Sequence, residues 1–179
     1  MLTLKVTPKE IYDSTSGRFI DIPGGVYHLE HSLLAISKWE SITHKPFLTK
    51  ETKTHDESLL YIECMVLDDV TDFNFINFLS PEEQQEISKY MMDENTATTI
   101  NNNDSKPNRE VLTSELIYYY LVAATIPFEC ETWHINRLFM LINIAGIKNN
   151  PGKKQDAKAT LRKNKALNDA RRKSMSTKG

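Results

Sequence analysis

The chain has 179 residues, enough for one domain that buries roughly 70% of the surface of its unfolded chain. Its hydrophobic fraction of 40% and charged fraction of 26% are ordinary for a globular protein, and the net charge of −2 alone suggests no polyanionic partner. The longest apolar run, Ile117–Phe128, is too short to cross a bilayer, and the N-terminus lacks a charged leader followed by a long apolar core. We therefore expect a soluble cytosolic protein with no membrane partner.

The charge is unevenly distributed along the chain. Residues 148–179 hold 11 lysines and arginines against Asp156 and Asp169, a net charge of +9, which leaves −11 for residues 1–147. The sequence thus predicts an acidic body followed by a basic tail.

The first 31 residues carry a strand pattern. Leu2, Leu4 and Val6 alternate with polar residues, which is the period of a half-buried strand. Two further short extended pieces, Phe19–Ile22 and Val26–Glu30, lie beside turn-rich segments. We predict a small β meander of about three strands.

Three helices are predicted next. Ser32 opens a helix that carries Leu33, Ile36 and Trp39 and ends before Pro46; a second begins at a capping box of Thr54 and Glu57. The run Ser80-Pro81-Glu82-Glu83 starts a third helix that ends near Met92, because it combines an N-cap serine, a first-turn proline and a glutamate at the third position. Residues 93–108 are predicted to be a mobile polar loop.

The region from Thr113 to Ile147 is the most apolar part of the chain. Thr113 is a suitable N-cap, Pro127 ends a first helix at Ile126 and suits the first turn of a second, and Gly146 is the expected end of that second helix. These features predict a helical hairpin at the centre of the fold.

The predicted fold class is therefore α+β: mainly α, with a small N-terminal β meander. The helical body is built around the C-terminal helical hairpin. Residues 1–31 form the meander, residues 32–147 the helical body, and residues 148–179 a basic tail that is helix-prone or disordered, because it has too little apolar surface to fold alone.

The sequence contains no Gly-x-Gly-x-x-Gly, Walker, His-Glu-x-x-His or Gly-x-Ser-x-Gly motif, and we expect no catalytic residue, cofactor or metal. Cys130 and His134 lie four apart on a predicted helix, which suggests a thiolate–imidazole pair, but no third orienting group accompanies them. His28, Glu30 and His31 would not converge on a metal if they lie on a strand. Cys64 and Cys130 are expected to be buried free thiols in a reducing compartment.

One run is typical of a particular family. It reads Pro127-Phe128-Glu129-Cys130-Glu131-Thr132-Trp133-His134-Ile135-Asn136-Arg137-Leu138. With it, the chain resembles the tail assembly chaperones of tailed bacteriophages of the siphophage type, which have similar Ile-Pro-Phe-Glu-Cys and Trp-His-x-Asn-Arg-Leu runs. Other matching pieces are Leu29–Leu33, Ser37–Glu40, His44–Leu48, Thr96–Thr99, Thr113–Glu115 and Asn164–Arg172. The likeness extends from about Leu29 to the end, except that Asn149-Asn150-Pro151-Gly152-Lys153-Lys154 replaces a double-proline linker.

The resemblance implies a non-enzymatic role in the host cytoplasm. Such chaperones bind the long, helical, aggregation-prone tape-measure protein until tail-tube subunits polymerise around it. We expect the partner-binding residues to lie in the hairpin and the tail: Leu116, Tyr120, Trp133, Arg137, Phe139, Lys153, Lys154, Lys158, Arg162, Lys163, Arg171 and Arg172.

Other functions are left open by the sequence. A virion structural protein, such as a tail-completion or connector subunit, would use the basic tail on DNA or on neighbouring subunits. A nucleic-acid-binding regulator would use the tail's cations on phosphates. The tail has no aromatic residue to stack on bases, which favours a protein partner over nucleic acid. Self-association is a further alternative.

Overall fold

The structure is a computed structural model that describes residues 1–13, 17–70, 73–99 and 110–149. The chain divides into two compact units, Met1–Ile142 and Asn143–Gly179. The contacts below belong to the first unit. Of the predicted tail, only Lys148 and Asn149 lie within the described residues, and of the predicted polar loop only residues 93–99.

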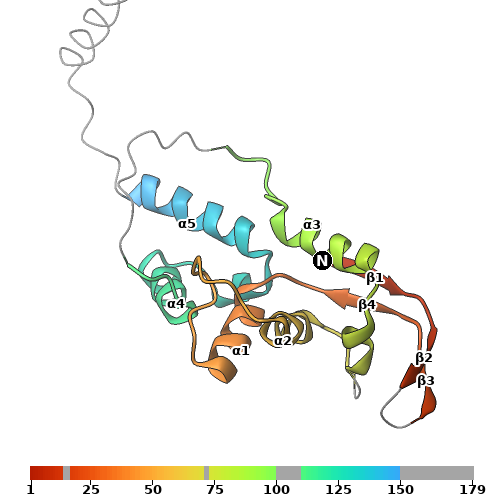
Figure 1. The fold of residues 1–179 in the computed structure, drawn as a ribbon. Coiled ribbons are helices and arrows are strands. Elements are labelled where there is room, and N and C mark those ends of the chain that lie inside the picture. Colours follow the sequence, from red (N-terminus) through yellow and green to blue (C-terminus); the bar gives the residue numbers. More distant parts are fainter. Residues whose placement is uncertain (14–16, 71–72, 100–109, 150–179) are drawn as a thin grey trace, which may run out of the picture. The chain divides into compact units, whose positions relative to one another are not determined.

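The described residues confirm the predicted fold class, with strands first and helices after them (Figure 1). The strands are β1 (Leu2–Val6), β2 (Lys9–Asp13), β3 (Arg18–Ile22) and β4 (Gly25–Leu29). The α-helices are α1 (Leu33–Thr43), α2 (His55–Met65), α3 (Pro81–Met92), α4 (Ser114–Ala123) and α5 (Ile135–Asn149). Two short 3₁₀ helices, η1 (Asn74–Phe78) and η2 (Phe128–Thr132), lie between them.

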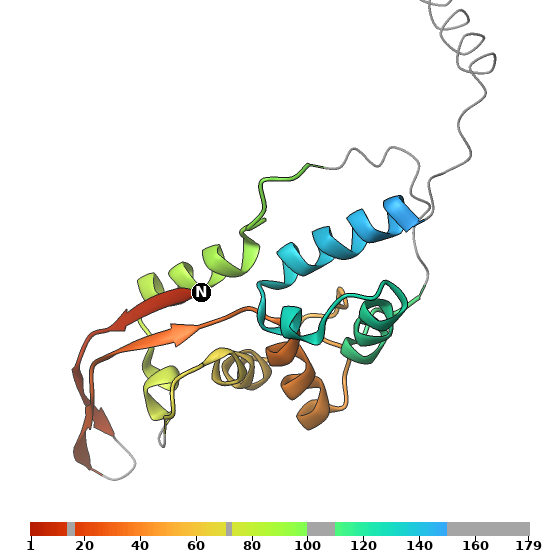
Figure 2. The same ribbon diagram turned by 180° about the vertical axis from the view of Figure 1, so that it is seen from behind.

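The strands form one long bent ribbon (Figures 1 and 2). β1 pairs with β4 and β2 pairs with β3, both antiparallel, in two separate two-stranded sheets. The ladder breaks where Pro8 faces Pro23-Gly24, since proline has no amide hydrogen to donate. A Cβ on Gly24 would lie only 2.5 Å from Cδ of Pro8, so this close approach requires glycine. The sequence prediction missed β2, whose charged residues hide the strand pattern.

The predicted helix starts are confirmed. Ser32 caps α1 by accepting the Ala35 amide, and Thr113 caps α4 in the same way. Thr54 with Glu57 and Ser80 with Glu83 form full capping boxes at α2 and α3. These caps satisfy amides that the first turn of a helix leaves without partners.

The core is centred on α1, which packs against both α2 and α4. Leu33, Ile36 and Trp39 of α1 are fully buried or nearly so. The Trp39 indole also donates a hydrogen bond of 2.8 Å to the Glu57 carbonyl at the start of α2. Helix α3 packs against strand β1.

The predicted second helix of the hairpin was wrong at both ends. Pro127 has an extended ψ of 143°, and the 3₁₀ helix η2 follows it. His134 then forms a β-bridge with Ser32, and the Ile135 amide donates a 2.7 Å hydrogen bond to the His31 carbonyl. These contacts hold Trp133 and His134 in extended backbone, so α5 starts only at Ile135. Gly146 does not end α5, because it keeps helical geometry and the helix continues to Asn149.

No helix in the described ranges is both long enough and apolar enough to cross a membrane.

Candidate partner-binding groove

Helices α2 and α3 flank an open groove, and α3 is anchored firmly beside it. The carboxylate of Glu83, buried in the first turn of α3, accepts hydrogen bonds from the amides of Thr7 and Ser80 and from the Lys9 ammonium, the last at 3.0 Å. Burial raises the pKa of Glu83, but these hydrogen bonds outweigh it and leave the pKa below its ordinary value. One side chain therefore caps α3 and ties it to the β-ribbon.

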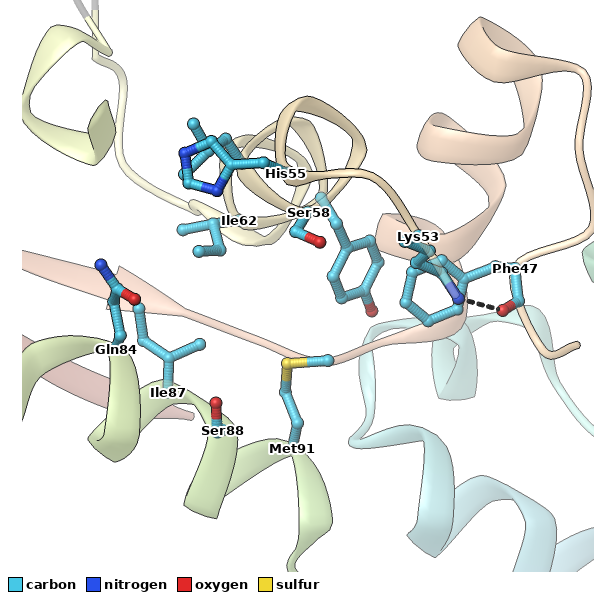
Figure 3. A pocket seen from close by; sticks show the side chains of 11 residues that line it. Phe47, Lys53, His55, Ser58, Ile62, Gln84, Ile87, Ser88 and Met91 are labelled. Carbon is cyan, nitrogen blue, oxygen red and sulfur yellow. Dashed lines mark hydrogen bonds between the residues drawn. The ribbon is translucent and has the colours of Figure 1, made fainter. Parts of the chain in front are cut away.

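The groove has a volume of about 270 Å³. It lies between α2 and α3 and is closed at one end by the connection from α1 to α2 (Figure 3). Its lining residues are Phe47, Lys53, His55, Ser58, Leu59, Tyr61, Ile62, Gln84, Ile87, Ser88 and Met91.

The floor of the groove is apolar and its rim is polar. Phe47, Tyr61 and Ile87 are buried, while Ile62 and Met91 are half-buried. The exposed side chains of His55, Ser58, Gln84 and Ser88 surround them. An apolar slot between two helices, with a flexible methionine at its side, suits the insertion of apolar side chains from an amphipathic helix.

Lys53 places a cation at the end of the groove. Its Nζ donates a 2.7 Å hydrogen bond to the Phe47 carbonyl and lies 4.2 Å from the centroid of the Phe47 ring. Burial lowers the pKa of Lys53. The aromatic ring and the carbonyl hold this ammonium in place, so a ligand in the groove meets a fixed donor there.

A cluster of polar side chains adjoins the groove through Tyr61, which belongs to both: Glu30, His31, Tyr61, Tyr90 and His134. His31 Nδ1 is hydrogen-bonded to the Tyr61 hydroxyl, and Tyr90 donates to Glu30. His134 Nε2 lies 3.1 Å from the Tyr90 carbonyl oxygen. Burial, and next to it the neighbouring His134, lowers the pKa of His31 from 6.5 to about 4. In the part of the chain that the structure describes, no buried side-chain nitrogen or oxygen lacks a partner, so the cluster joins elements instead of presenting a free reactive group.

The Cys130–His134 pair does not have the geometry that a shared helix would give it. Cys130 lies in η2, and His134 lies in the extended segment before α5. Burial, followed by the charge of Glu129, raises the pKa of the Cys130 thiol, which disfavours a thiolate. Both cysteines are free; Cys130 is buried and Cys64 is half-buried. No group of three or more potential metal ligands occurs within residues 1–13, 17–70, 73–99 and 110–149.

The predicted partner-binding residues in the described ranges lie outside this groove. Leu116, Tyr120, Trp133 and Phe139 are half-buried. Arg137 is exposed, and its guanidinium carbon lies 4.1 Å from the centroid of the Trp133 ring. The seven tail residues, Lys153, Lys154, Lys158, Arg162, Lys163, Arg171 and Arg172, lie outside the described residues. A role for all twelve stays a prediction.

Sequence reasoning missed the groove itself. Leu59 and Ile62 belong to an apolar stripe on α2 that predicts core packing. Ile87 and Met91, four residues apart on α3, predict the same for that helix. No local pattern marks the groove, because it depends on how far α2 and α3 lie from each other in the fold.

Comparisons with protein-family models, with curated proteins and with solved structures each found no match.

Proposed function

We propose that this chain is a phage tail assembly chaperone, which binds the tape-measure protein in the host cytoplasm during tail morphogenesis and catalyses no reaction. The observation that carries the proposal is the apolar groove between α2 and α3, with its polar rim. A chaperone of this kind must hold apolar side chains of a helical client without a permanent bond, and an open groove of this size provides such a reversible site.

The sequence supports the proposal in two further ways. The resemblance to tail assembly chaperones extends over most of the chain, and the acidic body and basic tail offer two oppositely charged regions to one client. Two weak attachments joined by a linker bind more tightly than either does alone, while each can still be displaced separately. This combination suits a chaperone that polymerising tail-tube subunits must later displace.

Coexpression with the tape-measure protein of the same phage tests the groove. We expect the wild-type chain to keep the client soluble and to copurify with it. The double variant Ile62→Ser/Met91→Ser should weaken the affinity for the client about tenfold, which corresponds to about 1.4 kcal/mol of binding free energy, and should therefore lower the copurified amount. The measurement is the amount of client in the soluble fraction and on the affinity column.

The matched control is Val111→Ser/Val122→Ser, which alters two exposed valines that do not line the groove. Urea unfolding of both double variants verifies that each remains folded. Equal client capture by the two variants would contradict the groove assignment. A wild-type chain that neither solubilises nor copurifies with the client would refute the proposed function.

A second prediction concerns the basic tail. Deletion of residues 153–179 should weaken the complex with the client and flatten its dependence on salt, since the deletion removes nearly all of the tail's positive charge. Titration of the client at several salt concentrations measures both effects. If the deletion leaves both the affinity and its salt dependence unchanged, the tail has no electrostatic role.

The finished virion separates this proposal from a structural role. A chaperone leaves when the tail tube forms, so purified particles should lack the chain. A tail-completion or connector subunit would be present in them at the number of copies that its ring requires.

A further inference from the structure

A second surface lies along the other side of α2. It consists of two adjoining hollows of about 280 Å³ and about 630 Å³. The hollows share Leu60, Glu63 and Phe73 as lining residues, so they form one continuous surface, which we call the acidic trough. It differs from the groove in Figure 3, whose α3 residues Gln84, Ile87, Ser88 and Met91 do not line it.

The floor of the acidic trough is apolar. Leu60, Cys64 and Phe73 are half-buried, and Leu67, just after α2, is 56% exposed. Leu60 and Cys64 lie four residues apart on α2 and so share one helix face, and Leu67, which follows the extended Val66, lines the same hollow and lengthens this apolar stripe. Ile42 of α1, which is 57% exposed, extends the stripe at one side. A helix packed alongside α2 would cover this stripe, as ridges and grooves of two helices interlock.

The charges around the stripe are nearly all negative. Asp56, Glu63, Asp68 and Asp69 line the trough, and Lys38 is its single basic lining residue in the described ranges. Asp68 is held in place because it accepts hydrogen bonds from the Nδ1 and the amide of His28, the first at 3.0 Å. Asp56 lines the smaller hollow, Asp68 and Asp69 line the larger one, and Glu63 lines both, a distribution that complements cations along the polar sides of a bound helix.

We infer that the acidic trough binds a basic amphipathic helix: a client segment of about three turns with leucine-like residues on one face and lysine or arginine beside them. This inference rests on the proposed function for the identity of the client and adds the chemistry of the segment that is bound. The trough supplies apolar contact for one face of the segment and four carboxylates for its cations.

Two labelled 18-residue helical peptides test the inference on the purified full-length chain. Both carry the same leucine face; one has lysine and arginine at the flanking positions, and the other has glutamate there. Fluorescence anisotropy should show that the basic peptide binds at least about tenfold more tightly, with an affinity that falls as salt rises. Equal binding of the two peptides, or binding that salt does not change, would overturn the assignment.

Variants locate the peptide on the trough. Leu67→Ser should weaken binding of the basic peptide about tenfold, since it removes a largely exposed apolar side chain from the predicted contact. Glu63→Gln/Asp69→Asn should weaken it by a factor of about 3 to 10 and reduce the salt dependence. The matched control is Val111→Ser, whose side chain is 55% exposed and lies elsewhere. If Val111→Ser weakens binding as much as Leu67→Ser does, the trough is not the binding site.

Two other occupants would also overturn the inference, and each has its own result. If the trough binds a second copy of the chain, sedimentation will show a dimer that Leu67→Ser dissociates. If it binds the chain's own basic tail, deletion of residues 153–179 will strengthen binding of the basic peptide, and the Leu67→Ser change will cancel that gain. Because the peptide assay does not involve the tape-measure protein, its failure is distinct from failure of the coexpression experiment.

Discussion

Replacing Glu40 with alanine is expected to lower the free energy of unfolding by about 3 kcal/mol, because each buried donor left without a partner costs about 1 to 3 kcal/mol. Glu40 lies in α1 with only 7% of its surface exposed. Its Oε1 accepts the amide of Phe47 and its Oε2 accepts the amide of Ser114, both at 2.7 Å. The carboxylate thus fixes both the loop that follows α1 and the first turn of α4.

Urea unfolding of the purified variant measures this effect. The control is Glu86→Ala, an exposed glutamate in the middle of α3, which should change the free energy of unfolding by no more than about 0.5 kcal/mol. A Glu40→Ala variant as stable as Glu86→Ala would show that water satisfies the two amides and that Glu40 does not join the elements.

Acidification between pH 6.5 and pH 4 is expected to cost the protein about 3 kcal/mol through His31 alone, since each pH unit between two pKa values corresponds to about 1.36 kcal/mol. In the fold, the pKa of His31 is about 4, because burial disfavours the charged ring and the nearby His134 adds to this. In the unfolded chain, the pKa has its ordinary value of 6.5.

The sign follows from proton uptake. Between these pKa values the unfolded chain binds the His31 proton and the folded chain does not, so protonation favours unfolding. The stabilisation is complete above pH 6.5 and is lost as the pH falls toward 4. The carboxylates of Glu57, Asp68 and Glu83, whose pKa values are lowered, lose their contributions at a lower pH. The loss of stability between pH 6.5 and pH 5 therefore reports protonation of the His31 imidazole, without a contribution from these carboxylates.

The matched variant for this prediction is His31→Asn, whose amide can still meet the Tyr61 hydroxyl but does not titrate. Its stability should be lower than that of the wild type at pH 7 and nearly constant from pH 6.5 to 5, while the wild type loses stability. His55→Asn, at an exposed histidine, should keep the wild-type slope. If His31→Asn keeps that slope as well, another group is responsible for the acid sensitivity.

Local signals predicted local structure well. The caps at Ser32, Thr54, Ser80 and Thr113 were all readable, because an N-cap acts on amides within three residues of itself. The predicted restart of a helix at Pro127 failed for the opposite reason. The start of α5 is set by the hydrogen bond from the Ile135 amide to the His31 carbonyl, about a hundred residues away in sequence. No local pattern predicts that contact.

The candidate site was less predictable than the fold. Glu40 looks like any other polar residue on an amphipathic helix, and its two acceptor roles appear only when α4 lies beside α1. The apolar residues of α2 predict burial but not which of them face a groove or a trough, because that depends on how far α3 and η1 lie from α2. The proposed client-binding surfaces therefore come from the structure, while the family resemblance comes from the sequence.

The break in the β-ribbon at Pro8 and Pro23-Gly24 divides it into two units of unequal stability. The inner pair, β1 and β4, is held by α3, whereas β2 and β3 leave Tyr12 and Phe19 largely exposed and in contact with each other. Because no ladder hydrogen bond crosses the break, opening of the outer pair need not spread to the inner one. The outer end of the β2–β3 pair can therefore fray or be remodelled on its own, whereas its inner end stays tied to the body through the Lys9 contact with Glu83 and the buried side chain of Ile22.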